Sequence, residues 1–299
     1  MLRKITYLIL VALIPLISDA QRWKRFRKEY SFGIGASNFL GDLGGANQVG
    51  TNGLKDLEIA LTRPAAIAAY RYQLTYDLYW KTNLTYLRVN GDDHLTEEPA
   101  RKIRELKFRS PIWELSTQLE YMIIKEKSGH LYRLRGVRGQ SWFRMNVYIF
   151  GGIGGIWFNP RAQYTDGKWY SLRNLGTEGQ GLPDGPPKYS GFTFITRYGI
   201  GFKRNLDRIG MKSIGLELTA HNTFSDYIDD VSGNYYNTDI IRQNSGDAAA
   251  YFADPGGVYQ GPAGHGQQRG DPNNDDAYMS AMLTFNFKIR QRRRNLPKF

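Results

Sequence analysis

The sequence predicts an all-β protein: an eight-stranded antiparallel up-and-down transmembrane β-barrel with long extracellular loops. Three observations support this prediction: alternating apolar and polar residues in about eight segments, connections that alternate in length, and an apolar run near the N-terminus. Alternation with period two indicates strands that each have one apolar face. A barrel that crosses a membrane needs that face outside, because lipid surrounds it and polar groups lie within.

The last predicted strand, 277–289, keeps the alternation along its whole length. Its apolar face carries Ala277, Met279, Ala281, Leu283, Phe285, Phe287 and Ile289. The other face is polar apart from Met282. A soluble edge strand with such a face would invite aggregation. The strand is therefore better explained as the one that closes a membrane barrel.

Seven earlier segments show the same alternation, more loosely in the third. They are 30–39, 65–74, 80–90, 113–123, 143–157, 192–203 and 212–222. Each is near the roughly 9–11 residues that a tilted membrane strand requires. The glycine-rich stretch 151–155 is assigned to a strand, because no amphipathic helix follows it as a nucleotide-binding loop would require. Within a loop, 97–106 is expected to form a short helix.

The connections alternate in length, as they do in bacterial outer-membrane barrels. The long polar segments are 40–63, 91–111, 159–190 and 223–276, and the shorter links are 75–79, 124–141 and 204–211. Such barrels have short periplasmic turns and long external loops. With both chain ends in the periplasm, the four long segments are expected outside the cell.

The N-terminus has the pattern of an export signal. Arg3 and Lys4 precede the apolar run 5–17, and small residues at 18 and 20 precede a cleavage point after Ala20. The run is shorter than the roughly 20 residues of a membrane-spanning helix. We therefore expect a cleaved signal peptide, 1–20, and an outer-membrane barrel domain, 21–299, with basic periplasmic ends. The chain has no cysteine, which excludes disulfides, thiolate metal sites and cysteine nucleophiles, and no cofactor is expected.

Charged residues on the polar strand faces separate a membrane barrel from a soluble, lipocalin-like one, which would be apolar inside. The expected inward charges are Arg71, Glu114, Glu120, Arg144, Arg197 and Glu217. Such charges can pair within a lumen but are costly against lipid. An eight-stranded barrel is just wide enough for side chains. These residues therefore predict a polar plug, with function located at the two rims.

The two rims differ in charge. The chain carries 40 Lys and Arg against 28 Asp and Glu, and basic clusters fall on the predicted periplasmic side, whereas the last external loop is rich in Asp. The partner-binding candidates are Arg25, Arg27, Arg133, Arg135, Arg138, Arg292, Arg293 and Arg294. A basic rim can steer an acidic partner or bind anionic headgroups. No nucleic acid and no small-molecule substrate are expected for an exported membrane barrel.

A run beyond the seventh strand carries a family resemblance. It includes Asp226, Tyr227, Ile228, Asp229, Asp230, Val231 and Ser232, and shorter matches begin at Gly33 and continue to Tyr278. The set resembles the PorG-like outer-membrane β-barrel family of the Bacteroidetes type IX secretion system. The resemblance implies an outer-membrane, non-enzymatic component of that apparatus. Its implied role is to anchor or assist a periplasmic ring of PorK- and PorN-type proteins.

Other functions remain open from the residues alone. One is an outer-membrane lipid or peptide hydrolase with His221 as its base, although Glu217, four residues away in an extended strand and so over roughly 13 Å distant, does not orient it. Another is a structural or surface-binding barrel. The Asp226, Asp229 and Asp230 cluster suits either calcium or backbone amides at a turn, and the turn is favoured. We expect that the protein is not an enzyme.

Overall fold

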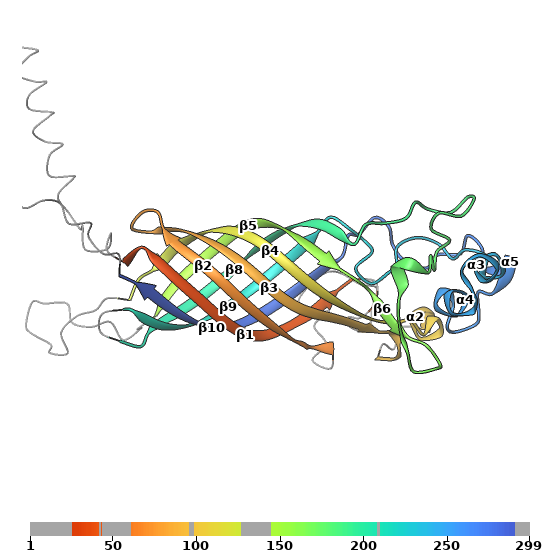
Figure 1. Ribbon diagram of the computed structural model, residues 1–299, viewed down its shortest axis with the longest axis horizontal. Coiled ribbons are helices and arrows are strands. Elements are labelled where there is room, and N and C mark those ends of the chain that lie inside the picture. The colour runs from red at the N-terminus through yellow and green to blue at the C-terminus, as the bar shows by residue number, and fades with distance from the viewer. Residues whose placement is uncertain are drawn as a thin grey trace, which may run out of the picture.

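Eight antiparallel strands form a closed barrel in the computed structural model, which describes residues 26–41, 43, 61–95, 99–126, 145–207 and 210–290. The barrel strands are β1 (Lys28–Leu40), β2 (Arg63–Gln73), β3 (Leu78–Asp92), β4 (Lys107–Ile124), β5 (Asn146–Phe158), β8 (Phe192–Asn205), β9 (Lys212–Thr223) and β10 (Ala277–Ile289). Strands adjacent around the barrel pair antiparallel, and the β1–β10 and β3–β4 pairings complete the circle. The predicted fold class is confirmed (Figure 1).

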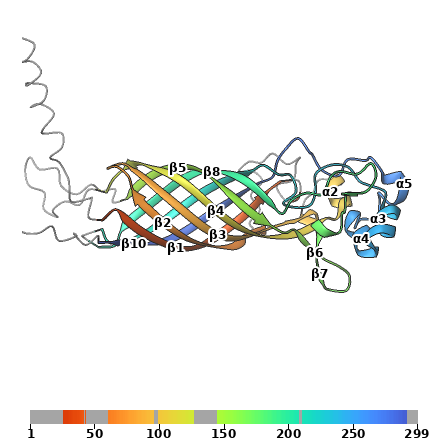
Figure 2. The same ribbon diagram turned by 45° about the horizontal axis from the view of Figure 1, so that its top comes forward.

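The smaller elements gather beyond one end of the barrel, as both views show (Figures 1 and 2). They are η5 (Asp93–Leu95), α2 (Pro99–Arg104), β6 (Arg161–Gln163), β7 (Trp169–Ser171), η6 (Leu172–Asn174), α3 (Thr238–Ser245), α4 (Asp247–Ala253) and α5 (Gly261–Gly264). We call the described parts of 93–106, 159–191 and 224–276 the cap. No helix in the described ranges has the length and apolarity to cross a membrane.

The barrel wall is apolar outside and polar inside, which β4 shows most clearly. Trp113, Leu115, Leu119 and Tyr121 are each at least 50% exposed on the outer face. The residues between them are at most 3% exposed and point into the lumen: Glu114, Ser116, Gln118 and Glu120. An apolar outer face suits contact with lipid, and polar residues that face the lumen can pair with one another there. The wall therefore fits a membrane barrel and not a lipocalin-like barrel, which would be apolar inside.

The lumen changes character along its length. Towards the cap it is filled by apolar side chains, including Leu87, Ile112, Ile156 and Ile195, all at most 1% exposed. They belong to one cluster with Ile228, Val231 and Phe252 of the cap. The sequence pattern predicted only the polar part of the filling. The barrel and its cap therefore share a hydrophobic core, and the cap loops fold onto the strands that carry them.

The predicted strand bounds agree best with the observed ones where the outer face of the strand is apolar. The last strand, β10, has the predicted limits, whereas β4 begins six residues before the predicted 113. There, β3 and β4 continue to pair as far as Asp92 and Lys107, so the loop between them is shorter than the predicted 91–111. This extension carries the two strands into the cap. The short helix expected within 97–106 is present as α2.

Candidate functional site

A chain of ion pairs fills the half of the lumen nearer the chain ends. Arg71 Nε lies 2.5 Å from Glu120 Oε2, and Arg71 Nη1 lies 3.6 Å from Glu29 Oε1. Lys81 Nζ lies 2.5 Å from Glu217 Oε1 and 3.9 Å from Glu120 Oε1. Lys203 pairs with Glu29 and is the last member of this series of ion pairs. The structure thus brings together Arg71, Glu120 and Glu217 from the predicted plug.

The predicted plug did not include three residues of this series of ion pairs. Glu29, Lys81 and Lys203 alternate with outward-facing residues on their own strands, so the period-two pattern could have identified them. The buried charges of the described barrel strands are Glu29, Glu114, Glu120, Glu217, Arg71, Lys81, Arg197 and Lys203. Four are acidic and four basic, so the filling is balanced in charge.

A second cluster in the lumen surrounds Glu114. Arg197 Nη1 lies 2.7 Å from Glu114 Oε1, and the Tyr278 hydroxyl donates to Glu114 Oε2 at 2.9 Å. His221 Nδ1 lies 3.1 Å from the same Oε2, while its Nε2 is 3.0 Å from the Ser280 hydroxyl oxygen. Glu114 therefore lies beside His221, whereas Glu217, as expected, belongs to the other cluster.

The Ser280, His221 and Glu114 side chains have the spacing of a nucleophile, its base and an orienting carboxylate. All three are buried, and the His221 ring stacks on Tyr278 with centroids 4.3 Å apart. Arg197 and Tyr278 also engage both oxygens of Glu114. A hydrolase must admit a substrate to its nucleophile. The burial of His221 and its contacts with Glu114 and Tyr278 favour a structural role for it, although Ser280 also lines a pocket in the barrel wall.

The family motif lies at the centre of the cap. Asp229 accepts hydrogen bonds from the Leu43 and Val231 backbone amides, at 3.1 and 2.9 Å. The Tyr227 ring stacks on Tyr189 at 4.4 Å, and Asp226 is buried. The Asp229 carboxylate thus meets backbone donors, as expected of a turn. Among the residues that the structure describes, no cluster of three or more His, Cys, Asp or Glu is placed to hold a metal.

Asp230 is the motif residue with the most constrained surroundings. Its carboxylate accepts hydrogen bonds from the hydroxyls of Thr177, at 2.5 Å, and Tyr189. Its backbone oxygen accepts a 2.7 Å bond from Arg269, which is paired at 2.8 Å with Glu178. Burial raises the pKa of Asp230 to about 6, although Arg269 and the two hydroxyl donors oppose this rise. The carboxylate thus ionises at a cost in the folded cap.

We expect Asp230→Asn to stabilise the cap above pH 6. The pKa of Asp230 is raised from 3.8 in the unfolded chain to about 6 in the folded cap. The protonated side chain therefore contributes its full stabilisation below about pH 4, and this contribution is lost as the pH rises through 6. The loss is on the order of 3 kcal/mol. Asn keeps the shape and tolerates the positive φ of 68° at this position. Amide exchange of 228–232 should show greater protection in the variant at pH 7.5 and little difference at pH 4.

Asp239→Asn is the matched control for this measurement, because the Asp239 side chain is exposed at the start of α3. It should leave protection of 228–232 unchanged at both pH values. Equal protection in Asp230→Asn and the unmodified protein at pH 7.5 would mean that ionised Asp230 does not destabilise the cap.

The basic partner-binding candidates lie mostly outside the described residues. Arg27 is described at the end of the barrel opposite the cap, where its Nη1 donates to the Tyr72 hydroxyl at 3.3 Å. Those outside the described ranges are Arg25, Arg133, Arg135, Arg138, Arg292, Arg293 and Arg294, together with Arg144 of the predicted plug. We call this opposite end of the barrel the inner rim (Figure 1). It contains the starts of β1 and β5 and the ends of β4 and β10.

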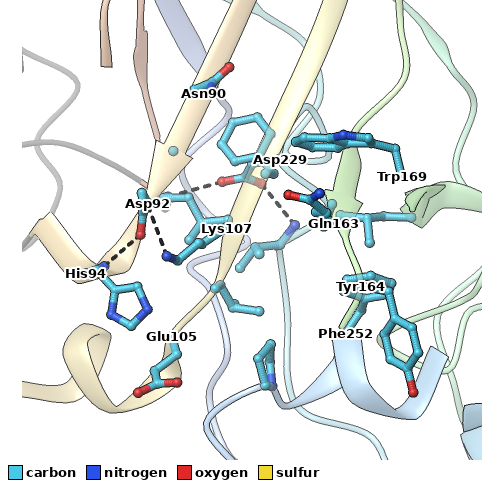
Figure 3. A pocket seen from close by; sticks show the side chains of 18 of the residues that line it. Asn90, Asp92, His94, Glu105, Lys107, Gln163, Tyr164, Trp169, Asp229 and Phe252 are labelled. Atoms are coloured by element: carbon cyan, nitrogen blue, oxygen red, sulfur yellow. Dashed lines mark hydrogen bonds and ion pairs between the residues drawn. The ribbon is translucent and has the colours of Figure 1, made fainter. Parts of the chain in front are cut away.

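A cavity of about 440 Å³ lies where the barrel meets the cap. Its walls come from the outer ends of β3 and β4, the β6–β7 hairpin and the region of α4. Figure 3 shows Asp92, His94 and Lys107 on one side and Tyr164 and Trp169 on the other. Sequence reasoning missed this site, because its residues come from distant loops that show no motif in common. We call it the cap cavity.

Comparisons with known proteins add the family. A search among curated proteins gives no match. Two crystal structures of Ail, the attachment invasion locus protein of Yersinia pestis, are similar at 10% sequence identity, with TM-scores of 0.39 and 0.35. Each comparison covers 89% of this chain and 99% of Ail, and the first structure is a complex with the heparin analogue sucrose octasulfate. A family model described as a domain of unknown function, DUF6089, matches residues 4–171, more than half of the chain. The chain is therefore a member of the DUF6089 family.

Proposed function

We propose that this outer-membrane barrel is a non-enzymatic component of the type IX protein secretion apparatus, in which its inner rim anchors a periplasmic ring of PorK and PorN type. The fold supports the coarser function, a structural or surface barrel of the outer membrane. The secretion role is supported by the family resemblance of 226–232 and by the charges of the inner rim. The described lumen is filled by side chains with balanced charges, so it provides no passage for a protein. The function is therefore assigned to the rims.

The observation that carries the proposal is the charge arrangement of the inner rim. The described acids there are engaged within the rim itself: Asp77 lies 2.6 Å from Lys125, and Glu126 accepts from the Asn205 amide at 3.0 Å. Asp207 accepts from two backbone amides of the β8–β9 turn. Among the described residues at this end, the exposed basic ones are Lys28, Arg204, Lys212 and Arg290. The rim therefore presents net positive charge to the periplasm.

The strand topology supports a combined action of three basic segments. The segments that hold Arg25, 133–138 and 292–294 join the barrel at the start of β1, between β4 and β5, and at the end of β10. One exposed ion pair contributes only about 0–1 kcal/mol. Several pairs with one acidic partner act together and speed the encounter. An acidic surface on the ring is thus the partner chemistry that the rim fits.

The test is capture of PorK- and PorN-type ring proteins from detergent-solubilised envelopes at low and high salt. The variant reverses Arg292, Arg293 and Arg294 to Glu, and the matched control is Arg242→Glu in the exposed part of the cap. We expect capture to weaken with salt, since screening shortens electrostatic range. Capture should also fall roughly tenfold in the reversed tail, the effect of about 1.4 kcal/mol.

Heat-modifiable gel mobility checks that each variant remains a folded barrel. Equal capture by the folded tail variant and the control, at every salt concentration, would remove the tail from the docking surface. Absence of ring proteins from all captures would contradict the proposed function itself.

A further inference from the structure

We propose that the cap cavity binds a neutral glycan at the outer surface. The site lies at the end of the barrel opposite the inner rim and is independent of docking to a periplasmic ring. Its volume, about 440 Å³, falls in the range of roughly 300–1,000 Å³ that small-ligand sites occupy. Concave sites of this size orient a ligand with a few placed polar groups against an apolar wall.

The two walls of the cap cavity differ in chemistry. The wall from β6, β7 and α4 is aromatic, with Tyr164, Trp169, Tyr251 and Phe252. Trp169 and Tyr251 remain 44% and 37% exposed, although aromatic side chains of this size are usually well covered. The Tyr164 ring contacts Tyr251 edge-on, with centroids 5.1 Å apart, so the rings support one another. This wall offers fixed ring surface to an apolar face of a ligand.

The facing wall, from the outer ends of β3 and β4, carries charged groups beside Leu106 and Phe108. Asp92 accepts from the His94 backbone amide at 3.0 Å, and Lys107 Nζ lies 3.4 Å from its other oxygen. Glu105 lines the same side, at a φ of 56° that a side chain rarely adopts. Figure 3 shows these residues across the cavity from Trp169. A sugar ring has both matching parts: a face of C–H groups for the rings and an edge of hydroxyls that donate and accept.

The charges favour a neutral ligand over an acidic or basic one. Among the residues that the structure describes, the charged ones that line the cavity are Arg63, Lys107, Arg269, Asp92, Glu105 and Asp229, three of each sign. Lys107 is paired with Asp92, and Arg269 with Glu178. A sulfated glycan or an acidic peptide would need a surplus of positive charge to offset the desolvation of its own charges. Uncharged hydroxyls need only the hydrogen-bonding groups present here.

Trp169 is the residue on which the test depends. The Arg109 guanidinium lies over its ring, 4.0 Å from the centroid, and fixes the ring at the cavity wall. Trp169→Ala removes the stacking surface, whereas Trp169→Phe retains an aromatic ring. Lys168→Ala is the matched control, because Lys168 is the exposed neighbour of Trp169 in the same hairpin and does not line the cavity.

The experiment is calorimetric titration of the full-length mature protein in detergent with neutral trisaccharides of glucose, mannose, galactose and N-acetylglucosamine. We expect saturable binding of at least one trisaccharide, at least tenfold weaker in Trp169→Ala and nearly unchanged in Trp169→Phe and Lys168→Ala. The sulfated form of the same trisaccharide should bind no more tightly. The proposal is overturned by no saturable binding across the panel, by tighter binding of the sulfated form or of an acidic peptide, or by unchanged binding in Trp169→Ala.

Discussion

Replacement of Glu120 by Ala is expected to destabilise the barrel by about 3–5 kcal/mol, the effect of leaving a buried charge without its partner. Glu120 is completely buried between Arg71 and Lys81. It also accepts a hydrogen bond from Gln118 at 2.9 Å. Without this carboxylate, the described barrel interior would hold four buried basic groups and three acidic ones. Because water cannot enter a filled lumen freely, solvent compensates little of that imbalance.

Urea unfolding in lipid vesicles, followed by tryptophan fluorescence, measures this loss. Asp247→Ala is the control, since the Asp247 side chain is 81% exposed in the cap, and its pair with Arg242 is worth at most about 1 kcal/mol. If Glu120→Ala unfolds at the same urea concentration as the control, the ion-pair chain does not stabilise the barrel.

Leu119→Arg is expected to cost roughly 2–4 kcal/mol, the penalty for a basic residue on the lipid face near the bilayer midplane. Leu119 is 52% exposed on the outer face of β4, where it pairs with Trp80 on one side and Gly151 on the other. Neither of these cross-strand neighbours is acidic, and lipid cannot solvate the guanidinium. The same replacement in the water-exposed cap should cost much less.

Val258→Arg is therefore the matched control, because Val258 is a 57% exposed apolar residue in the cap. Folding yield and urea midpoint in bilayers should fall for Leu119→Arg and stay near those of the unmodified protein for Val258→Arg. Equal losses in the two variants would show that the outer face of β4 does not contact lipid.

The sequence predicted the barrel well because its signal is local. Each strand shows its two faces to its own neighbours in sequence, so β10 was located to the residue. At the start of β4 the outer residues are Arg109 and Pro111, which hide the alternation although the backbone still pairs with β3. The alternation of polar and apolar residues therefore did not predict the part of β4 that extends into the cap.

The pairing within the lumen could be predicted only in part. Period two identifies inward residues, but the register and tilt of the strands decide which of them meet. Arg71 reaches Glu120 two strands away, and Lys203 reaches Glu29 across the barrel. The cap cavity was beyond sequence reasoning, since its walls depend on how 159–191 and 224–276 fold over the ends of β3 and β4.

Labelling of introduced cysteines tests most directly whether the barrel crosses the outer membrane with its cap outside. The chain has no cysteine, so single replacements report single positions. Lys168 is exposed in the cap hairpin, and Asp77 lies in the β2–β3 turn at the inner rim. A membrane-impermeant maleimide should label Lys168→Cys in intact cells and Asp77→Cys only after the outer membrane is permeabilised. Labelling of Asp77→Cys but not Lys168→Cys in intact cells would contradict this orientation and place the chain ends outside.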